Sequence, residues 1–339
     1  MRFDRMDAGP PTGVSRRRLI LGTLLGAAAA PALLSSARAE NFPARPVRMV
    51  VTVSAGGGAD ATARLIASKL ADLWGQPVVV ENRVGATGMI GAELVAKSPP
   101  DGYTALFAST SLVQAPALFP NAPYDIARDF APVSQIAGLA VVFVVNAASP
   151  YRTLQDYLAA AHRNQPPVTY GSMGTGSSLH IFGATLAKDA AANLVHVPYK
   201  GEAPALNDLV GGHVDSCFAS VASAAPLIAG GRLRPLAVVG EVRVPLLPDV
   251  PSFVELGFPH LNALGWYGIL LPAGTAQPIV AKFATDVAAV MKRDDIAKSI
   301  RDGGNTPMAT APQEFKEMLA RDFAKWRQLI QQADIKPPA

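Results

Sequence analysis

Two segments rich in glycine and serine hold the residue types most suited to binding a ligand. Ser54–Asp60 follows an apolar run at 47–53, and Gly171–Ser178 follows the short run Val168–Tyr170. Each is expected to lead from the end of a strand into a helix, whose first N–H groups are unpaired and carry a partial positive charge. Glycine allows close approach to the backbone, and hydroxyl groups add hydrogen-bond donors. Together the segments favour an anion site in a cleft between them.

Neither segment has the spacing of a phosphate motif. The Gly-Lys-Ser/Thr ending of a P-loop is absent from both, and so is G-x-G-x-x-G followed by a confirming acidic residue. A nucleotide or phosphate ligand is therefore disfavoured. Taken alone, each glycine cluster is equally compatible with an ordinary tight turn, so the pair is more informative than either segment.

A third segment, Val197–Glu202, also leads from an apolar run towards a helix. Tyr199 could present its hydroxyl group to the cleft, and Lys200 could balance a carboxylate. The alternative is a solvated loop, which fits Lys200 better than Tyr199 because lysine is usually exposed.

A catalytic role is the competing interpretation of the segment Gly171–Ser178. Ser177 and Ser178 lie close to His180, and Asp208 or Asp215 could complete a triad. The G-x-S-x-G elbow is absent and nothing identifies an oxyanion hole, so a serine hydrolase is only the alternative hypothesis. The histidines are scattered, with no H-E-x-x-H motif, so neither a metal site nor a cofactor is predicted.

Apolar runs alternate with helical patterns along most of the chain. The expected strands are Val47–Val53, Pro77–Glu81, Tyr103–Ala108, Leu139–Val145, Val168–Tyr170, Leu194–Val197, Ser216–Ala219 and Leu233–Val239. This alternation predicts an α/β fold of mostly parallel sheets flanked by helices, divided between two lobes with a ligand cleft between them. Asp60 is expected to cap the helix that follows the first strand.

Two further features are expected to be structural. Apolar residues from Phe315 to Ile330 recur at three- and four-residue spacing, which predicts an amphipathic helix packed on a core. The single cysteine, Cys217, lies in an apolar strand-like run. It is predicted to be a buried thiol rather than a nucleophile.

The N-terminus has the three regions of an export signal. Consecutive arginines at 16–18 precede an apolar stretch at 19–34, and Ala37-Arg38-Ala39 fits a cleavage site. Residues 1–39 are therefore predicted to be a cleaved signal peptide, of the Tat type because of its twin arginine. The alternative is a membrane anchor, but the stretch is short for a span.

Removal of the predicted signal peptide changes the net charge of the chain. The chain has 30 basic and 26 acidic residues among its 339, and residues 1–39 hold six arginines and two aspartates. The remaining 300 residues carry 24 charges of each sign. A neutral mature protein lacks the basic footprint of a nucleic-acid-binding protein, so no nucleic-acid partner is predicted.

Several segments together resemble the substrate-binding proteins of tripartite tricarboxylate transporters, the Bug or TctC-like family. The resemblance spans the mature chain in order, through Phe42–Val47, the loop leading to Asp60, Gly75–Arg83, Pro100–Thr104, His196–Gly201, Leu247–Pro251 and Pro272–Thr275. It implies a type II periplasmic binding protein in which residues 40–139 and 241–339 form one lobe and residues 140–240 the other. The implied ligand is a small carboxylate: a di- or tricarboxylate, an acidic amino acid or an aromatic acid.

The resemblance also implies which residues contact the ligand, through backbone amides and hydroxyl groups rather than arginines. They are Ser54, Ala55, Gly57, Gly58, Ala59, Asp60, Ser109, Thr110, Ser172, Met173, Gly174, Thr175, Gly176, Ser177, Tyr199 and Ser220. The implied partners are integral-membrane transporter subunits, or a sensor kinase if the protein signals, and the expected form is a monomer. The sequence departs from the family pattern at Ser54-Ala55, at Val84–Gly88 and within Ile181–Ala184, which leaves the identity of the ligand open.

Overall fold

The computed structural model describes residues 42–56, 58–163 and 166–335. The chain divides into two units, Met1–Phe42 and Pro43–Ala339, and the helices and strands described below belong to the second. The predicted signal peptide and the predicted site residue Gly57 lie outside the described residues. Within the described ranges, no helix is long and apolar enough to cross a membrane.

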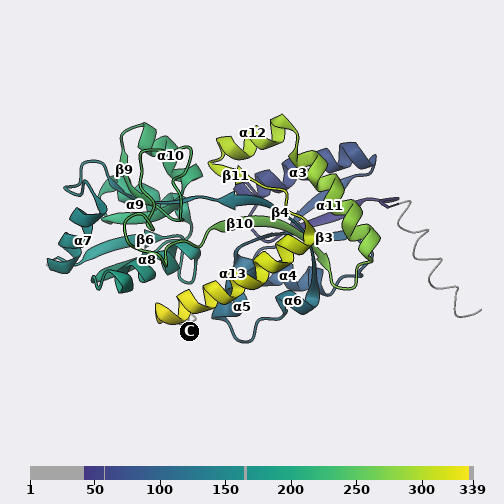
Figure 1. The fold of residues 1–339 in the computed structure, drawn as a ribbon, viewed down its shortest axis with the longest axis horizontal. Coiled ribbons are helices and arrows are strands. Elements are labelled where there is room, and N and C mark those ends of the chain that lie inside the picture. Colours follow the sequence, from purple (N-terminus) through teal and green to yellow (C-terminus); the bar gives the residue numbers. More distant parts are fainter. Residues whose placement is uncertain (1–41, 57, 164–165, 336–339) are drawn as a thin grey trace, which may run out of the picture. The chain divides into compact units, whose positions relative to one another are not determined.

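The first sheet is mixed and draws on both ends of the chain (Figure 1). Its strand order is β11 (Asn305–Pro307), β4 (Phe130–Leu139), β10 (Gly265–Pro272), β3 (Thr104–Ser109), β1 (Val47–Val51) and β2 (Val78–Asn82). β1 pairs in parallel with β2 and β3, whereas β10 runs antiparallel to β3 and β4. β1 and β3 consist almost wholly of buried residues, as expected for strands covered on both faces.

Helices cover both faces of this sheet. One group comprises α3 (Gly58–Trp74), α11 (Gln277–Met291) and α12 (Asp294–Asp302), which contact one another. The other comprises α4 (Met89–Ala96), α5 (Ser111–Leu118) and α13 (Pro312–Gln332). The predicted amphipathic helix is confirmed, because Phe315, Leu319 and Trp326 of α13 are buried.

The second sheet is built from the middle of the chain. Its strand order is β7 (Leu194–Pro198), β6 (Val168–Ser172), β8 (Ser216–Ser220), β5 (Val141–Asn146) and β9 (Leu233–Val238). Its helices are α7 (Leu154–Arg163), α8 (Ser178–Asp189), α9 (Glu202–Gly211) and α10 (Val221–Ala229). Alternate strand residues face opposite helices: Phe143 and Phe218 share a core with α7 and α8, whereas Val144 and Cys217 pack with α9 and α10. Cys217 is buried as predicted, and burial raises the pKa of its thiol to about 12.

The predicted α/β fold with two sheets flanked by helices is confirmed, but the sheets are mixed rather than mostly parallel. β4 and β10 were not predicted from the sequence, and they run antiparallel to neighbours in the first sheet. The predicted strand Leu139–Val145 covers the last residue of β4 and most of β5. Ala140 separates these two strands, which belong to different sheets. A strand that returns to a sheet from elsewhere in the fold is free to run antiparallel, and the local sequence carries no signal of its direction.

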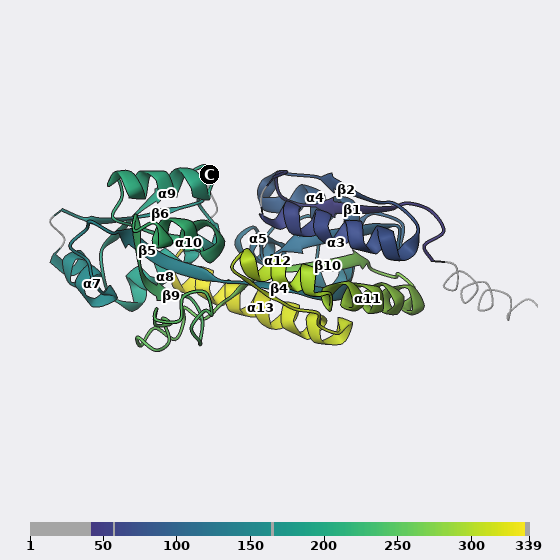
Figure 2. The ribbon, with the colours of Figure 1, turned by 90° about the horizontal axis from the view of Figure 1, so that it is seen from above.

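Residues 239–264 follow β9 and pack against the second sheet. The Phe253 N–H donates to the Val238 carbonyl at 2.9 Å, and the Val238 N–H donates to the Pro251 carbonyl at 2.9 Å. The Phe253 ring stacks on Phe218 with 5.7 Å between centroids. α13 also reaches this side of the molecule, where Trp326 lies 5.4 Å from Phe182 between centroids (Figures 1 and 2). Aromatic side chains therefore tie segments from three parts of the chain to one core.

Phe253→Ala is expected to lower the free energy of unfolding by about 3–5 kcal/mol, because removal of the fully buried ring leaves a cavity in its place. Urea unfolding followed by circular dichroism measures the change. The matched control is Val242→Ala in the same segment, since Val242 is 75% exposed and its loss leaves no cavity. Equal effects of the two substitutions would contradict the packing described for this segment.

Candidate ligand-binding site

A cavity of about 740 Å³ lies where loops from both sheets meet. Its volume is in the range of small-molecule sites, about 300–1,000 Å³. The loops after β1 and β3 line it on the side of the first sheet, and those after β6 and β8 line it on the side of the second. Both glycine-rich segments predicted from the sequence therefore border one cavity.

Five helices begin at this cavity, namely α3, α5, α8, α9 and α10. Residues of the first turn of each helix line it, and Ser177 and Ser220 are the N-caps of α8 and α10. Their side chains accept from His180 N–H and Ser223 N–H, respectively. Each helix start brings unpaired N–H groups and a partial positive charge. The arrangement is therefore suited to an anion that carries several acceptor atoms.

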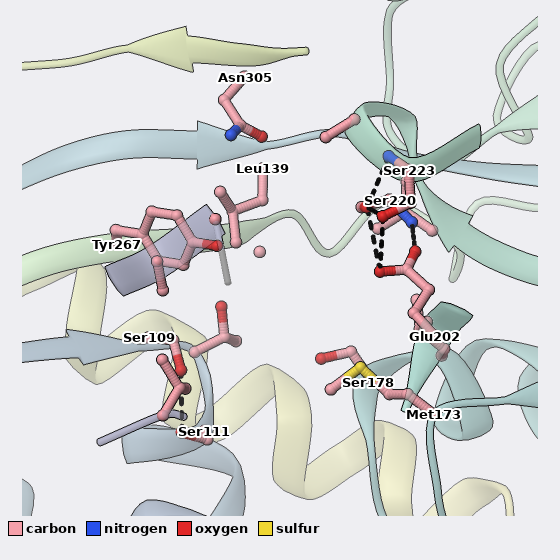
Figure 3. A pocket seen from close by; sticks show the side chains of 18 of the residues that line it. Ser109, Ser111, Leu139, Met173, Ser178, Glu202, Ser220, Ser223, Tyr267 and Asn305 are labelled. Atoms are coloured by element: carbon pink, nitrogen blue, oxygen red, sulfur yellow. Dashed lines mark hydrogen bonds between the residues drawn. The ribbon is translucent and has the colours of Figure 1, made fainter. Parts of the chain in front are cut away.

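Hydroxyl groups line the side of the first sheet (Figure 3). The Ser109 and Ser111 hydroxyl groups lie 3.0 Å apart, and Tyr267 of β10 directs its hydroxyl group into the cavity. Burial raises the pKa of Tyr267 to about 12, with a further contribution from the charge of Glu202. Tyr267 therefore remains a neutral hydrogen-bonding group at physiological pH. Thr110 also lines the cavity, and its Oγ1 accepts from the Trp266 N–H at 2.7 Å, which fixes α5 to β10.

Asp60 holds the first loop from behind and does not line the cavity. Its carboxylate accepts from the Gly56 N–H, Arg64 Nε and Asn82 Nδ2, each at 2.9 Å. The hydrogen bond from Arg64 is the main reason that its pKa falls to about 2. The predicted helix cap is wrong in this detail, because Asp60 lies in the first turn of α3 and bonds to the preceding loop instead.

Two histidines support the loop after β6. The His196 Nε2 and the Ser172 hydroxyl group lie 2.7 Å apart, and the Gly176 N–H donates to His180 Nδ1 at 3.0 Å. The two imidazole rings stack with 3.9 Å between centroids. Burial lowers the pKa of both side chains, that of His196 to about 4, where the nearby His180 also contributes. Both rings are therefore neutral at pH 7, and His180 keeps Nδ1 free to accept.

The side chains considered for a serine hydrolase are bonded elsewhere. Ser177 Oγ donates to the Gly174 carbonyl at 2.7 Å and accepts from the His180 N–H. The Ser178 hydroxyl group accepts from Gln114 Nε2 at 2.7 Å. The His180 ring is bonded to Gly176 through Nδ1, so these serines and this histidine do not form a nucleophile and base.

Most of the predicted site residues come together at the cavity. Those that line it are Gly58, Ala59, Ser109, Thr110, Met173, Gly174, Thr175, Ser177 and Ser220. Those that do not line it are Ser54, Ala55, Asp60, Ser172, Gly176 and Tyr199. Ser54 and Ala55 are exposed, Ser172 and Gly176 are buried, and Tyr199 donates to Asp208 Oδ2 at 2.9 Å. The exposure of Lys200 agrees with the solvated loop.

Several lining residues were not among the predicted ligand contacts, although Ser178 and Glu202 end two of the segments singled out in the sequence. They are Thr87, Ser111, Gln114, Ser178, Glu202, Ser223, Tyr267 and Asn305. Ser111, Ser178 and Ser223 lie within three residues of predicted positions, so a wider window would have included them. Tyr267 and Asn305 come from β10 and β11, and no local pattern links these strands to the cavity.

Comparison with known proteins gives the family. The profile of the tripartite tricarboxylate transporter family receptor, TctC, matches residues 62–335. The chain belongs to this family. A UPF0065 protein in the tcbD–tcbE intergenic region of Pseudomonas sp. strain P51 is 37% identical over 94% of each chain. The resemblance noted in the sequence is thereby confirmed, and the chain is a solute-binding protein of a family of periplasmic receptors.

Two solved structures are similar to this fold over most of the chain. Rpa4515 of Rhodopseudomonas palustris with adipate has a TM-score of 0.78 and 33% identity, and the match covers 88% of this chain and 100% of that one. MatC of the same organism, with bound malate, has a TM-score of 0.75 and 29% identity over 85% of this chain and 100% of the other. This TctC-family chain therefore has the two-lobed fold of periplasmic binding proteins.

Thr87 borders the cavity in a strained conformation. Its φ is 55° within the 3₁₀ turn η1 (Ala86–Gly88), and a β-branched residue rarely adopts a positive φ. Thr87→Gly is expected to raise the free energy of unfolding by about 1 kcal/mol, since glycine adopts this φ without strain. Urea unfolding measures it, with Thr62→Gly in α3 as a control that should be destabilising. A loss of stability in Thr87→Gly would contradict this account.

Mild acid is expected to destabilise the protein through the protonation of His196. The unfolded chain binds a proton at His196 near the ordinary pKa of 6.5, whereas the folded protein does so only near 4. The free energy of unfolding should therefore be constant above pH 7 and fall between pH 6.5 and 4. Urea midpoints against pH test this. The slope should diminish in His196→Gln and persist in His213→Gln, since His213 is exposed. An unchanged slope in His196→Gln would contradict the assignment.

Proposed function

We propose that this TctC-family protein is exported to the periplasm and captures a small carboxylate for integral-membrane transporter subunits. The observation that carries the proposal is the meeting of several helix starts and hydroxyl groups at one cavity. No lysine, arginine or histidine is among the described residues that line it. Backbone N–H groups and hydroxyl groups would therefore bind the anion, and the adipate and malate of the solved relatives support this ligand class.

The lobe division is part of the proposal. We propose that the chain first crosses between lobes at Ala140, where β4 of the first sheet meets β5 of the second. The second crossing was predicted from the sequence near Gly240. The contacts of Phe253 with Val238 and Phe218 favour a later crossing, close to Leu264, because residues 239–264 pack on the second sheet. Closure of the two lobes over the ligand would remove it from water and strengthen its hydrogen bonds.

A thermal-shift screen of mono-, di- and tricarboxylates tests the ligand class. The protein is first unfolded and dialysed to remove any ligand that co-purifies, and then refolded. A carboxylate present at about 100 times its Kd should stabilise the folded protein by about 2.7 kcal/mol, because it binds only the native state. Nucleotides and sugars serve as negative controls. Stabilisation by none of the carboxylates would rule out the proposed ligand.

The hydroxyl groups of the first sheet should contribute directly to affinity. The double variant Ser109→Ala/Ser111→Ala is expected to weaken carboxylate binding at least tenfold, since a hydrogen bond to a charged group contributes about 1.5–3 kcal/mol. Isothermal titration calorimetry with the best compound of the screen measures the loss. Ser98→Ala is the matched control, because Ser98 bonds to the Leu94 carbonyl and does not line the cavity. Unchanged affinity in the double variant would exclude this part of the site.

A further inference from the structure

Glu202 is the only carboxylate among the described residues that line the cavity. It stands at the start of α9 and is half-buried, and no salt bridge joins it to a cationic side chain of the described chain. A negative charge on the wall of an anion site is unexpected, because it opposes the binding of a second negative charge. Its position therefore bears on which carboxylates this receptor accepts.

The Glu202 carboxylate occupies the start of α10. One oxygen accepts from the Ser220 N–H, and the other lies 3.1 Å from Ser220 Oγ and 3.2 Å from Ser223 Oγ (Figure 3). These donors match an ionised carboxylate, which can only accept. Burial raises the pKa of the Glu202 carboxyl group, and these hydrogen bonds counteract part of that rise. Glu202, the first residue of α9, thus supplies an internal anion at the start of α10, which leaves the starts of α3, α5 and α8 for the ligand.

Glu202 lines the cavity on the side of the second sheet. It contributes to the raised pKa of Tyr267, which lies on the opposite wall. The remaining polar side chains on the wall are hydroxyl and amide groups, which do not neutralise it. A ligand group beside Glu202 is consequently favoured when it is positively charged and disfavoured when it is a second carboxylate.

We infer that Glu202 makes this receptor selective for carboxylates that also carry a cationic nitrogen. The ligand carboxylate would lie at the starts of α3, α5 and α8, and its ammonium group would face Glu202. The inference rests on the proposed carboxylate-binding function and adds the second charged group of the ligand. It assigns Glu202 the role of a specificity-determining residue.

Matched pairs of compounds test this selectivity on the refolded, ligand-free protein. Aspartate and succinate share a carbon skeleton and differ by one ammonium group, and glutamate and glutarate form a second pair. Calorimetry on the wild-type protein should give at least tenfold tighter binding of the amino compound in each pair that binds. In Glu202→Gln this ratio should fall to about one or reverse, because the amide removes the charge and retains the shape.

Two controls separate selectivity from folding. The melting temperature of ligand-free Glu202→Gln shows that the variant folds, and Glu314→Gln on the exposed surface of α13 should retain the wild-type ratio. Plain dicarboxylates that bind the wild-type protein as tightly as their amino counterparts would overturn the inference and leave the proposed function intact. An amino preference that persists in Glu202→Gln would overturn the role of Glu202. Failure of every carboxylate to bind would overturn both proposals.

Discussion

The backbone N–H groups at the helix starts around one cavity are the constraint on which this receptor depends. A helix cannot satisfy its first N–H groups internally, so each start requires an acceptor from a cap, from water or from a ligand. In this chain α3, α5, α8 and α10 all begin at the carboxyl ends of strands and at one cavity. Their partial charges add at that point, which is how a wall without lysine, arginine or histidine among its described residues can attract an anion.

The loops that carry these N–H groups are held from behind by side chains that do not line the cavity. Asp60 fixes the first loop through Gly56, Arg64 and Asn82. The stacked His180 and His196 fix the loop after β6. Residues of this supporting kind are hard to distinguish from ligand contacts in a sequence, because both types sit in the same short segments and both are polar. A site of backbone donors depends on such supports, because the donors keep their direction only while the loop keeps its shape.

Glu202 places a negative charge on the wall of a cavity whose other described lining side chains are neutral. Serine hydroxyl groups and helix starts accept any carboxylate of suitable size, since they adapt their donors to the ligand. A fixed negative charge at the start of α10 distinguishes ligands by what they carry beside the carboxylate. Family membership indicates the general class of ligand. One charged side chain on the wall can restrict which ligands of that class an individual receptor binds.

The sequence by itself determined the α/β class, the two glycine-rich loops, the amphipathic C-terminal helix and the buried thiol of Cys217. These features follow from hydrophobic periodicity and local turn residues, which involve residues only a few positions apart in the sequence. The tertiary structure decided that β4 and β10 join the first sheet, that Tyr267 and Asn305 reach the cavity, and that Asp60 and Tyr199 face away from it. It also placed Glu202 against Ser220, 18 positions along the chain. Strand order and side-chain direction depend on partners distant in sequence, and no local pattern records them.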